Sequence, residues 1–374
     1  MVFLPDDGRG ESGYLEAMLS NFSASYKLYW FKGLLEEVLE GKREIAFSSI
    51  VHKMISYAWY PVLYYNLNLG KADLLADTVR FLAKGKDFQI SMDSTQKEII
   101  GFLNECKDNE VREKAKNFEN MVPYRLVRPF FEKEIAVAKQ SGLKDHQVNR
   151  LIEDLSKKTP LSLYEIERES GKLLVNEEWA KYLIKNEALI KGWLNYKLVD
   201  YLQKRNPSIP AIPYKIFPPE KRDLREASNI FKKVLRYSEM KDIFTDLPFN
   251  NDNQVEHGGI SIDHFIPWSF VLHDELWNLC PTFKNINSEK GNKIPQMKYI
   301  DKFSTFQYQT FIAARREHVS EKELESYLTI KNDIFSIVEG QDKGREVFEN
   351  AIKNTINPLY QIAYNHGYEL WLKY

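Results

Sequence analysis

The sequence predicts a mainly α-helical protein in which helical N-terminal and C-terminal regions surround a small module of two strands and one helix. Three observations support this prediction. Apolar residues recur at three- and four-residue steps over much of the chain, which is the spacing of one helix face. The clearest strand-like runs, with glycine and proline punctuation, lie between residues 258 and 281. At 374 residues the chain is long enough for two or three domains, each with its own core.

Composition and charge narrow the function classes. The chain is 43% apolar and 28% charged, which is ordinary for a globular protein, and its net charge of -1 creates no global positive field. A site for a polyanion must therefore come from local clusters of basic residues. Cys106 and Cys280 are the only cysteines, which excludes a disulfide framework and a Cys-rich zinc knuckle and fits a reducing compartment.

We expect neither a secretion signal nor a membrane span. The first residues, MVFLPDDGRGESG, lack the basic and apolar regions of a signal peptide. The longest apolar run, YAWYPVLYY, is too short to cross a bilayer and contains a proline. The expectation is a cytoplasmic protein with no membrane partner.

Residues 1–135 are expected to form a helical N-terminal domain. A first helix follows Ser25, a plausible N-cap, because apolar residues from Leu28 to Val38 keep helical spacing. A second helix through FSSIVHKMISYAWY is expected to stop near Pro61. Further helices are expected over 95–106 and 110–120, and a short, possibly extended piece over 122–134.

Residues 136–235 are expected to be a second helical region that contains a proline-rich strap. The part over 140–175 is mixed, and one long amphipathic helix fits 176–205. Five prolines between 207 and 219 favour an extended, partly polyproline II strap at 206–219 between modules. A helix over 225–237 follows. Four tryptophans in the helical stripes are expected to be core residues: Trp30, Trp59, Trp179 and Trp193.

The module of two strands and one helix is expected within residues 236–300. GGISIDHF predicts a strand that ends with Asp263 and His264, and LHDELWNLCP predicts a turn and a second extended piece. TFKNINSEKG predicts a short helix with Thr282 as N-cap and Gly291 just past its end. Residues 301–374 are then expected to be a C-terminal helical segment, with helices over 321–340 and 344–371.

The polar residues of this module suit phosphodiester hydrolysis. Such chemistry needs a hard cation with oxygen ligands, and Asp263 offers an anionic oxygen while Asn287 offers a neutral one. It also needs a base for the attacking water, and the imidazole of His264 is suited to that near neutral pH. Neighbouring strand residues point to opposite faces, so a bulge or bend is expected where Asp263 and His264 serve one phosphate.

Two further polar residues have expected supporting roles. Asn278 can fix the imidazole through its ring or its backbone. Lys290 stands three residues after Asn287, so the two share a helix face. From there Lys290 can pair with phosphate or tune Asp263.

These residues resemble the motif of HNH (ββα-metal) endonucleases, in the subclass found inside CRISPR RNA-guided nucleases and many bacterial HNH proteins. The matching parts are DH at 263–264, P-x-SF at 267–270, Asn278, and N-x-x-K at 287–290 with Pro295 behind it. The resemblance implies that His264 is the general base and that Asp263 and Asn287 hold one Mg²⁺. It also implies a supporting Asn278 and an auxiliary positive charge at Lys290.

The sequence departs from the family pattern in ways that concern the metal. Its third motif position is Asn rather than His, which favours Mg²⁺, with Mn²⁺ as a substitute, over zinc. Many relatives carry a Cys-rich knuckle before the DH pair, but IFTDLPFNNDNQVEHGG contains no cysteine. No zinc is therefore expected.

Basic residues on both sides of the module are candidates for nucleic-acid contacts. Acidic neighbours dilute the set before the motif, so a solvated helix face is the alternative interpretation. Each true phosphate contact would make binding depend on salt. The nearby His257 and His273 are more often solvated spectators than substrate contacts. The predicted contacts are Arg222, Lys233, Lys293 and Lys298.

The sequence therefore predicts a Mg²⁺-dependent endonuclease acting on DNA, with a role in bacterial anti-phage defence or restriction by fold-level analogy. Two alternatives stay open. The helical regions can be a sensor or assembly module whose nuclease is silent without a partner protein, such as an ATPase or sensor, or without self-association. The module can instead be a non-catalytic nucleic-acid clamp.

Overall fold

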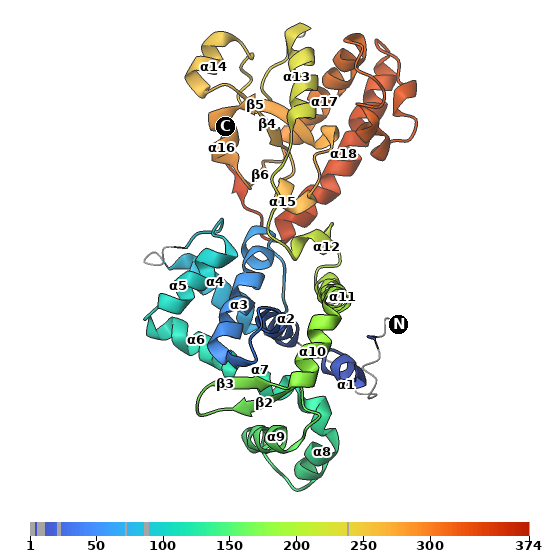
Figure 1. The fold of residues 1–374 in the computed structure, drawn as a ribbon. Helices are drawn as coiled ribbons and strands as arrows, with labels where there is room; N and C mark the ends of the chain where they lie inside the picture. The colour runs from blue at the N-terminus through green and yellow to red at the C-terminus, as the bar shows by residue number, and fades with distance from the viewer. Residues whose placement is uncertain are drawn as a thin grey trace. The chain divides into compact units, whose positions relative to one another are not determined.

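The chain divides into two compact units, each described here by itself. The computed structural model describes residues 4–5, 12–20, 24–71, 73–85, 90–237 and 239–373. The N-terminal unit comprises Met1–Pro207 with Ile212–Pro218, and the C-terminal unit comprises Ser208–Ala211 with Pro219–Tyr374 (Figure 1). Both are mainly helical with small sheets, which confirms the predicted fold class.

The N-terminal unit is built around α2 and α3, which pack against each other. Helix α3 packs on α2, α4, α5 and α6, whereas α2 also packs on α7, α10 and α11. Trp30 of α2 and Trp59 of α3 are fully buried, and Trp179 and Trp193 are buried too, as predicted. The helices are α1 Ser12–Met18, α2 Tyr26–Leu39, α3 Phe47–Trp59, π-helical η1 Tyr60–Tyr64, α4 Leu74–Lys84, α5 Gln96–Glu105, α6 Asn109–Glu119, α7 Val122–Leu126, 3₁₀-helical η2 Arg128–Phe131, α8 Glu132–Gln140, α9 Asp145–Lys158, α10 Glu177–Lys185, α11 Glu187–Arg205 and α12 Ile212–Lys215.

A small antiparallel sheet lies in the lower part of this unit in Figure 1, above α8 and α9. Strands β2 Tyr164–Glu167 and β3 Lys172–Val175 form a hairpin, and β1 Glu44–Ala46 pairs with β3 to give the order β1-β3-β2. The sheet therefore ties the loop before α3 to a hairpin far along the chain. The mixed region over 140–175 consists of α9 and this hairpin.

Two expectations for the N-terminal unit are wrong. Residues 122–134 are helical rather than extended, because Pro123 and Pro129 lie in the first turn of α7 and η2, where a helix needs no amide hydrogen. The single helix expected over 176–205 is two helices, α10 and α11, that meet at Asn186. The Asn186 side chain donates to Tyr182 O at 3.0 Å, a local bond that competes with helix continuation.

Ser25 precedes α2 as predicted, but its side chain does not cap that helix. The backbone N and the hydroxyl of Ser25 donate instead to Asp73 Oδ2, at 2.9 and 2.7 Å. Asp73 in turn caps α4 by accepting from Leu75 N at 3.0 Å. Burial raises the pKa of the Asp73 carboxyl, and the hydrogen bonds from Ser25 oppose that shift. One buried carboxylate therefore joins the starts of two helices.

The C-terminal unit places a two-stranded hairpin beside a layer of long helices (Figure 1). Helix α16 packs on both strands of the β4–β5 hairpin, while α13 and α18 pack on α17. After α18 the chain returns, so that β7 pairs in parallel with β6. The elements are α13 Arg225–Tyr237, α14 Asn251–His257, β4 Ile260–His264, α15 Trp268–Val271, 3₁₀-helical η3 Leu276–Asn278, β5 Leu279–Phe283, α16 Lys284–Lys290, β6 Ile294–Pro295, α17 Tyr299–Arg316, 3₁₀-helical η4 Glu325–Thr329 and η5 Ile334–Ser336, α18 Asp342–Asn365 and β7 Leu370–Trp371.

The C-terminal unit confirms the module and corrects details around it. Thr282 lies in β5 rather than at a helix N-cap, whereas Gly291 follows α16 with a φ of 51°, as predicted. The strap is interrupted by the one-turn helix α12. Residues 321–340 form turns and 3₁₀ helices, because hydroxyls such as those of Thr329 and Ser336 bond to carbonyls three residues earlier and compete with a regular helix. Helix α17 lies in the segment that was expected to be helical, although it was not predicted individually.

No helix within the described ranges has an apolar stretch long enough to cross a bilayer.

Replacing Asp73 by Ala is expected to destabilise the N-terminal unit. The change leaves the buried Ser25 amide and hydroxyl without their acceptor, which costs about 2–4 kcal/mol. Urea unfolding followed by tryptophan fluorescence measures this loss. Asp73→Asn is the control: it keeps one acceptor oxygen and should lose less than half as much. Equal unfolding midpoints for wild type and Asp73→Ala would show that the carboxylate does not join the two helices.

Candidate active site

The β4–β5 hairpin and α16 form one connected unit. Strand β4 pairs with β5 without interruption, from Ile260 opposite Phe283 to His264 opposite Leu279. The chain enters β4 through Gly258, whose φ is 74° and whose carbonyl accepts from Lys284 N at 2.9 Å. A side chain at residue 258 would also meet the amide of Asn285, with a Cβ 3.1 Å from its Oδ1. Glycine therefore allows the first turn of α16 to sit against the start of β4.

Helix α16 presents two polar side chains to one face of β4. Asn287 Nδ2 donates to Ser261 Oγ at 2.8 Å and to Ile262 O at 3.1 Å. Lys290 Nζ lies 3.2 Å from Asp263 Oδ1 and 3.0 Å from Oδ2. Ser261 and Asp263 share a face of the strand, so these contacts form two rungs.

The pair of Lys290 and Asp263 is a buried ion pair. Lys290 is 1% exposed and Asp263 is 4% exposed. Lys290 Nζ also donates to the carbonyl oxygen of His264 at 2.7 Å, so the ammonium bridges a side chain and the backbone of the same strand end. Asp263 Oδ2 is buried and accepts no hydrogen bond from any described residue. Both carboxylate oxygens thus lie beside the ammonium, Oδ2 at 3.0 Å from Nζ, although the geometry at Oδ2 is not that of a hydrogen bond.

His264 has its own partners, away from Asp263. Its Nε2 lies 2.7 Å from Asp274 Oδ1, and its Nδ1 lies 3.3 Å from Arg222 Nη1. Arginine only donates, so Nδ1 is the acceptor and Nε2 carries the ring hydrogen that Asp274 accepts. This assignment gives a neutral imidazole with its hydrogen on Nε2, so the Nδ1 lone pair is the one that faces Arg222. Arg222 also lies over the Trp268 ring, at 5.5 Å from its centroid.

The expected bulge between Asp263 and His264 is not present. The ladder is regular through His264 opposite Leu279, and the two side chains contact different groups, as alternation on a strand requires. His264 is, however, the last residue of β4. A phosphate can reach both side chains only over this end of the strand.

Asn278 supports the imidazole through the backbone rather than through the ring. It is fully buried, accepts from Ile266 N and donates to Ile266 O, both at 2.9 Å. Its own carbonyl accepts from Phe265 N at 2.8 Å. Asn278 thus clamps the two residues that follow His264 and fixes where β4 ends.

Asp274 was not predicted from the sequence, although it is the closest partner of the imidazole. The chain between α15 and η3 turns at Leu272, whose φ of 56° and ψ of 39° are left-handed. Such a conformation is uncommon for a leucine, and the turn contains no glycine or asparagine from which it could have been predicted. The turn brings Asp274 back to His264. Near it, burial lowers the pKa of His273 to about 4, so His273 is neutral at pH 7.

The loop before α14 is held by another carboxylate that was not predicted. Asp242 is fully buried and accepts from Thr245 N at 2.9 Å and from Thr245 Oγ1 at 2.7 Å. Burial raises the pKa of Asp242. Lys241 and Pro248 pair across the same loop. The segment in which many relatives have cysteines therefore closes through a buried turn.

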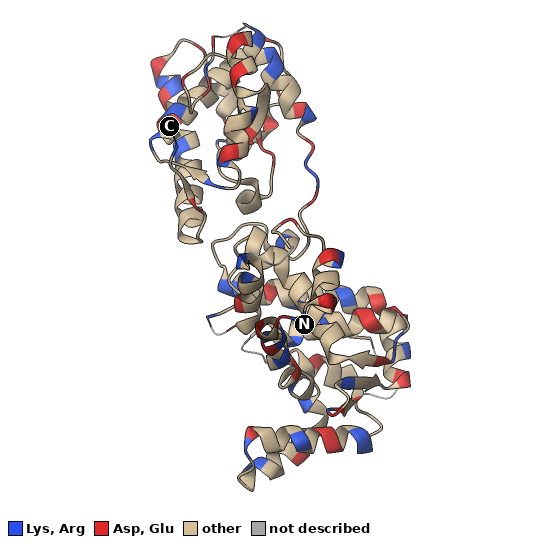
Figure 2. Ribbon diagram, turned by 90° about the vertical axis from the view of Figure 1, so that its left-hand side faces the viewer, with Lys and Arg blue, Asp and Glu red and all other residues tan. Residues whose placement is uncertain are grey.

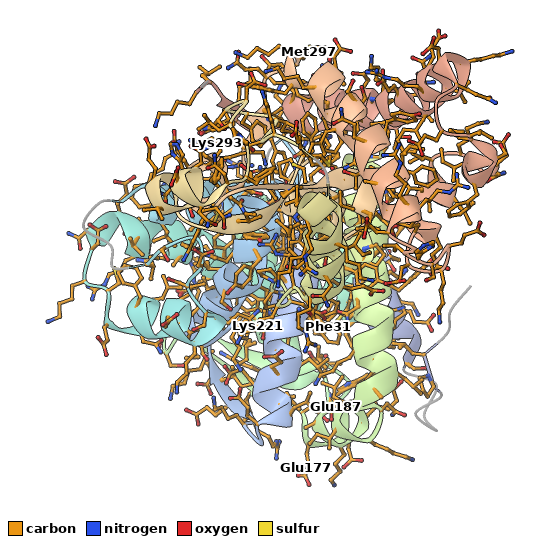
Figure 3. All side chains as sticks on the ribbon, turned by 90° about the horizontal axis from the view of Figure 1, so that it is seen from above. Phe31, Glu177, Glu187, Lys221, Lys293 and Met297 are labelled. Atoms are coloured by element: carbon orange, nitrogen blue, oxygen red, sulfur yellow. The ribbon has the colours of Figure 1, made fainter. Side chains whose placement is uncertain are left out.

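Of the predicted nucleic-acid contacts, the structure brings Arg222 to His264. Lys233 lies 4.0 Å from Glu323, and Lys298 lies over the Tyr299 ring, at 5.1 Å from its centroid. Lys293 is half-buried before β6, and Figure 3 shows it and Met297 on the C-terminal unit. Basic and acidic residues are interspersed along the helices (Figure 2). The basic residues predicted to contact nucleic acid therefore do not form a separate patch of positive charge.

The donor set at Asp263 and Asn287 fits a hard cation. It consists of Asp263 Oδ2, which is paired with the Lys290 ammonium, and the side-chain oxygen Asn287 Oδ1, which accepts no hydrogen bond within the described part of the chain. Carboxylate and amide oxygens are ligands that Mg²⁺ accepts while keeping several waters. No cluster of three or more His, Cys, Asp or Glu side chains is found among the described residues. A cation here would share Asp263 with the Lys290 ammonium.

A hairpin crossed by a helix, with Asp263 and His264 at the end of one strand and Asn287 on the helix, is the arrangement of the class of ββα-metal nucleases. Residues 242–296 match the family model of HNH endonucleases, so this segment is an HNH endonuclease domain. HNH endonucleases generally use divalent metal ions and act on nucleic acid. No curated protein and no solved structure shows a significant match to the chain.

Replacing Lys290 by Met is expected to destabilise the C-terminal unit strongly. The buried Asp263 carboxylate then loses its counter-charge, which costs about 3–5 kcal/mol. Urea unfolding measures the loss, and the double variant Asp263→Asn with Lys290→Met should recover most of it. Lys293→Met is the matched control and should change stability by less than about 0.5 kcal/mol. A Lys290→Met protein as stable as wild type would contradict the buried pair.

Proposed function

We propose that the protein is a Mg²⁺-dependent endonuclease that hydrolyses DNA phosphodiester bonds. The observation that carries this proposal is that two consecutive residues, Asp263 and His264, are each held in place by a different partner. Asp263 is held by Lys290, and His264 is held by Asp274. A carboxylate for a cation and an imidazole whose Nδ1 lone pair faces Arg222 are therefore neighbours at one strand end inside an HNH domain.

In this proposal Asp263 and Asn287 hold the metal through oxygen atoms, and Mn²⁺ can replace Mg²⁺. The bound cation neutralises charge that builds on the phosphate and on the leaving oxygen. Lys290 pairs with the Asp263 carboxylate and fixes its direction. The Ser261 hydroxyl and the Ile262 carbonyl orient the Asn287 amide so that its oxygen stays available.

His264 acts as the general base through Nδ1. The oxygen of a water molecule bonds to phosphorus, its proton passes to Nδ1, and the bond between phosphorus and O3′ breaks. The products carry a 5′-phosphate and a 3′-hydroxyl. Asp274 accepts the Nε2 hydrogen and stabilises the imidazolium that forms. Asn278 keeps the ring in place through Ile266.

Arg222 must leave Nδ1 before a water can approach it. Its guanidinium is suited to bind phosphate oxygens in pairs, so an incoming phosphate offers it a better partner than a neutral imidazole. We propose Arg222 as a phosphate contact on these grounds, with Lys233, Lys293 and Lys298 as further contacts. DNA rather than RNA, and a role in anti-phage defence or restriction, are part of the same proposal.

One observation favours the alternative of a nuclease that is silent without a partner. Both functional side chains are engaged by the protein's own cations, Lys290 on Asp263 and Arg222 on His264. Such a resting site needs a metal ion, a substrate or a partner protein to release it. Purified protein that cuts plasmid only after a partner is added would support this alternative, and prompt cutting with Mg²⁺ alone would exclude it.

His264→Ala is expected to abolish nicking of supercoiled plasmid in Mg²⁺. Loss of the base should reduce the rate by about 10²–10⁴-fold while DNA binding at fixed salt stays unchanged. EDTA should stop the wild-type reaction, and Mn²⁺ should restore it. His257→Ala, which removes a histidine of α14, is the control. Equal nicking by wild type and His264→Ala would overturn the proposed base.

Asp274→Asn is expected to slow nicking by about 10–100-fold without weakening DNA binding. The amide can still accept the Nε2 hydrogen, but it lacks the charge that stabilises an imidazolium. Asp274→Glu should recover part of the rate. A purely structural role predicts a different pattern, in which both variants lower the unfolding midpoint and neither changes the rate of the folded protein.

A further inference from the structure

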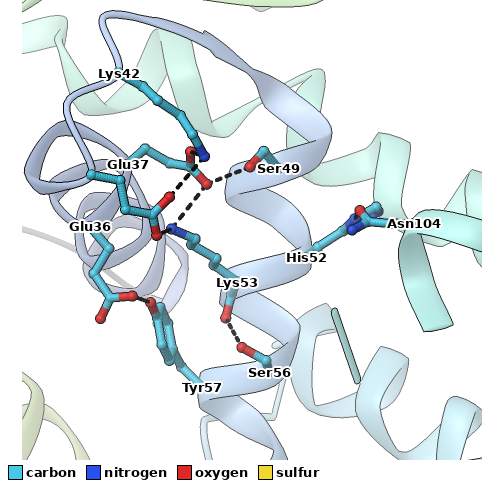
Figure 4. A network of polar contacts seen from close by, with 10 residues as sticks. Glu36, Glu37, Lys42, Ser49, His52, Lys53, Ser56, Tyr57 and Asn104 are labelled. Atoms are coloured by element: carbon cyan, nitrogen blue, oxygen red, sulfur yellow. Dashed lines mark hydrogen bonds and ion pairs between the residues drawn. The ribbon is translucent and has the colours of Figure 1, made fainter. Parts of the chain in front are cut away.

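The N-terminal unit contains a cavity that the proposed nuclease does not use. Its volume is about 260 Å³, and it lies between α2, α3, α11 and residues 216–218 of the strap. Lys32 and Glu36 come from α2, Tyr57 from α3, and Phe217 from the strap. Figure 4 shows Glu36 and Tyr57 facing each other across the two helices. The remaining lining residues are Leu35, Gln96, Lys191, Leu194, Asn195, Ile216 and Pro218.

Lys32 is a cation without an acid partner in this cavity. Its Nζ lies over the Tyr57 ring at 4.3 Å from the centroid and 5.8 Å from that of Phe217. It forms no ion pair or hydrogen bond with any described residue. Burial lowers the pKa of Lys32 to about 8, and the charge of Glu36 only partly opposes this. The ammonium is thus mostly charged at pH 7 but poorly solvated.

The other charged groups nearby are already engaged. The Tyr57 hydroxyl donates to Glu36 Oε2, and Lys191 lies 2.6 Å from Glu187. Two other lysines near this helix pair do have acid partners: Lys42, after the end of α2, and Lys53 of α3 both contact Glu37 and Glu40 (Figure 4). Lys32 differs from these two lysines, because its ammonium faces the rings of Tyr57 and Phe217, whereas theirs face carboxylates.

We propose that this cavity binds a small organic anion that joins a planar ring to a phosphate or carboxylate group. The anionic group would pair with Lys32, and the ring would lie against Tyr57 and Phe217. An anion offers the buried ammonium the oxygen acceptors that the rings do not supply. Gln96 and Asn195 provide amides for further polar contacts. The volume is below the roughly 300–1,000 Å³ of drug-sized sites, so the ligand is small.

Calorimetric titration of the full chain tests the proposal with four probes. Adenosine 5′-monophosphate and benzoate each combine a ring with an anion, whereas adenosine and inorganic phosphate each supply one half. At least one of the combined probes is expected to bind saturably at about millimolar concentration or below. Adenosine 5′-monophosphate, if it is the one that binds, should bind more tightly than adenosine or inorganic phosphate alone. Binding of only one combined probe identifies its anionic group. No saturable binding of either would overturn the proposal.

Two variants show whether Lys32 is the anion's partner. Lys32→Met should weaken binding about tenfold or more, without lowering the unfolding midpoint, because the change removes a poorly solvated charge from a partly apolar site. Lys97→Met removes an exposed charge beside Gln96 and should bind like wild type. Equal affinity in Lys32→Met and wild type would contradict the site.

The pH dependence of benzoate binding gives a second readout. Benzoate does not titrate between pH 7 and 9, so a change in affinity reports on the protein. The titratable groups facing the ammonium are Glu36 on its own helix, Tyr57 from α3 and Lys191 from α11. Since Lys32 loses its charge as pH rises through about 8, affinity should fall between pH 7 and 9. An unchanged affinity would contradict pairing with Lys32.

Discussion

The Lys290 ammonium is the contact on which the C-terminal module depends. It lies inside the protein between the Asp263 carboxylate and the His264 carbonyl, so it joins α16 to the last two residues of β4. Two buried charges are costly to desolvate, and an ion pair offsets that cost only when its geometry is good and its remaining polar groups are satisfied. Removal of either partner therefore affects both the fold and the site. The same contact fixes the rotation of α16, which in turn sets Asn287 against Ser261.

The local part of this site could be predicted because strand and helix periodicity are local rules. A strand that ends in Asp263 and His264, and a helix that presents Asn287 and Lys290 three residues apart, follow from a window of about thirty residues. The partners of the imidazole do not follow in this way. Asp274 reaches His264 through a left-handed Leu272, and Arg222 comes from the irregular stretch between α12 and α13. Tertiary packing decides both contacts.

The errors in the helical regions come from groups whose contacts apolar periodicity does not describe. Prolines at 123 and 129 suggested extended chain, but each lies in a first helical turn, where its missing amide hydrogen costs nothing. Ser25 had the composition of an N-cap, yet its hydroxyl serves Asp73, 48 residues away along the chain. Over 321–340 the apolar spacing favoured a helix, and hydroxyl contacts such as that of Ser336 with Asp333 favoured turns. Only the Ser25 contact lies far outside the window of periodicity, whereas the prolines and the hydroxyls act locally, through chemistry that apolar spacing does not describe.

The resting site contains more positive charge than a metal-binding site needs. Lys290 faces the carboxylate that is proposed to hold a cation, and Arg222 faces the lone pair that is proposed to accept a proton. Each arrangement stabilises the site before substrate arrives, because a buried carboxylate or imidazole without a partner is costly. Each is also weaker than what can replace it: a divalent ion carries twice the charge of an ammonium, and a phosphate binds a guanidinium better than a neutral ring does. Activation then requires only that these two cations exchange partners, while Asp274 and Asn278 stay where they are.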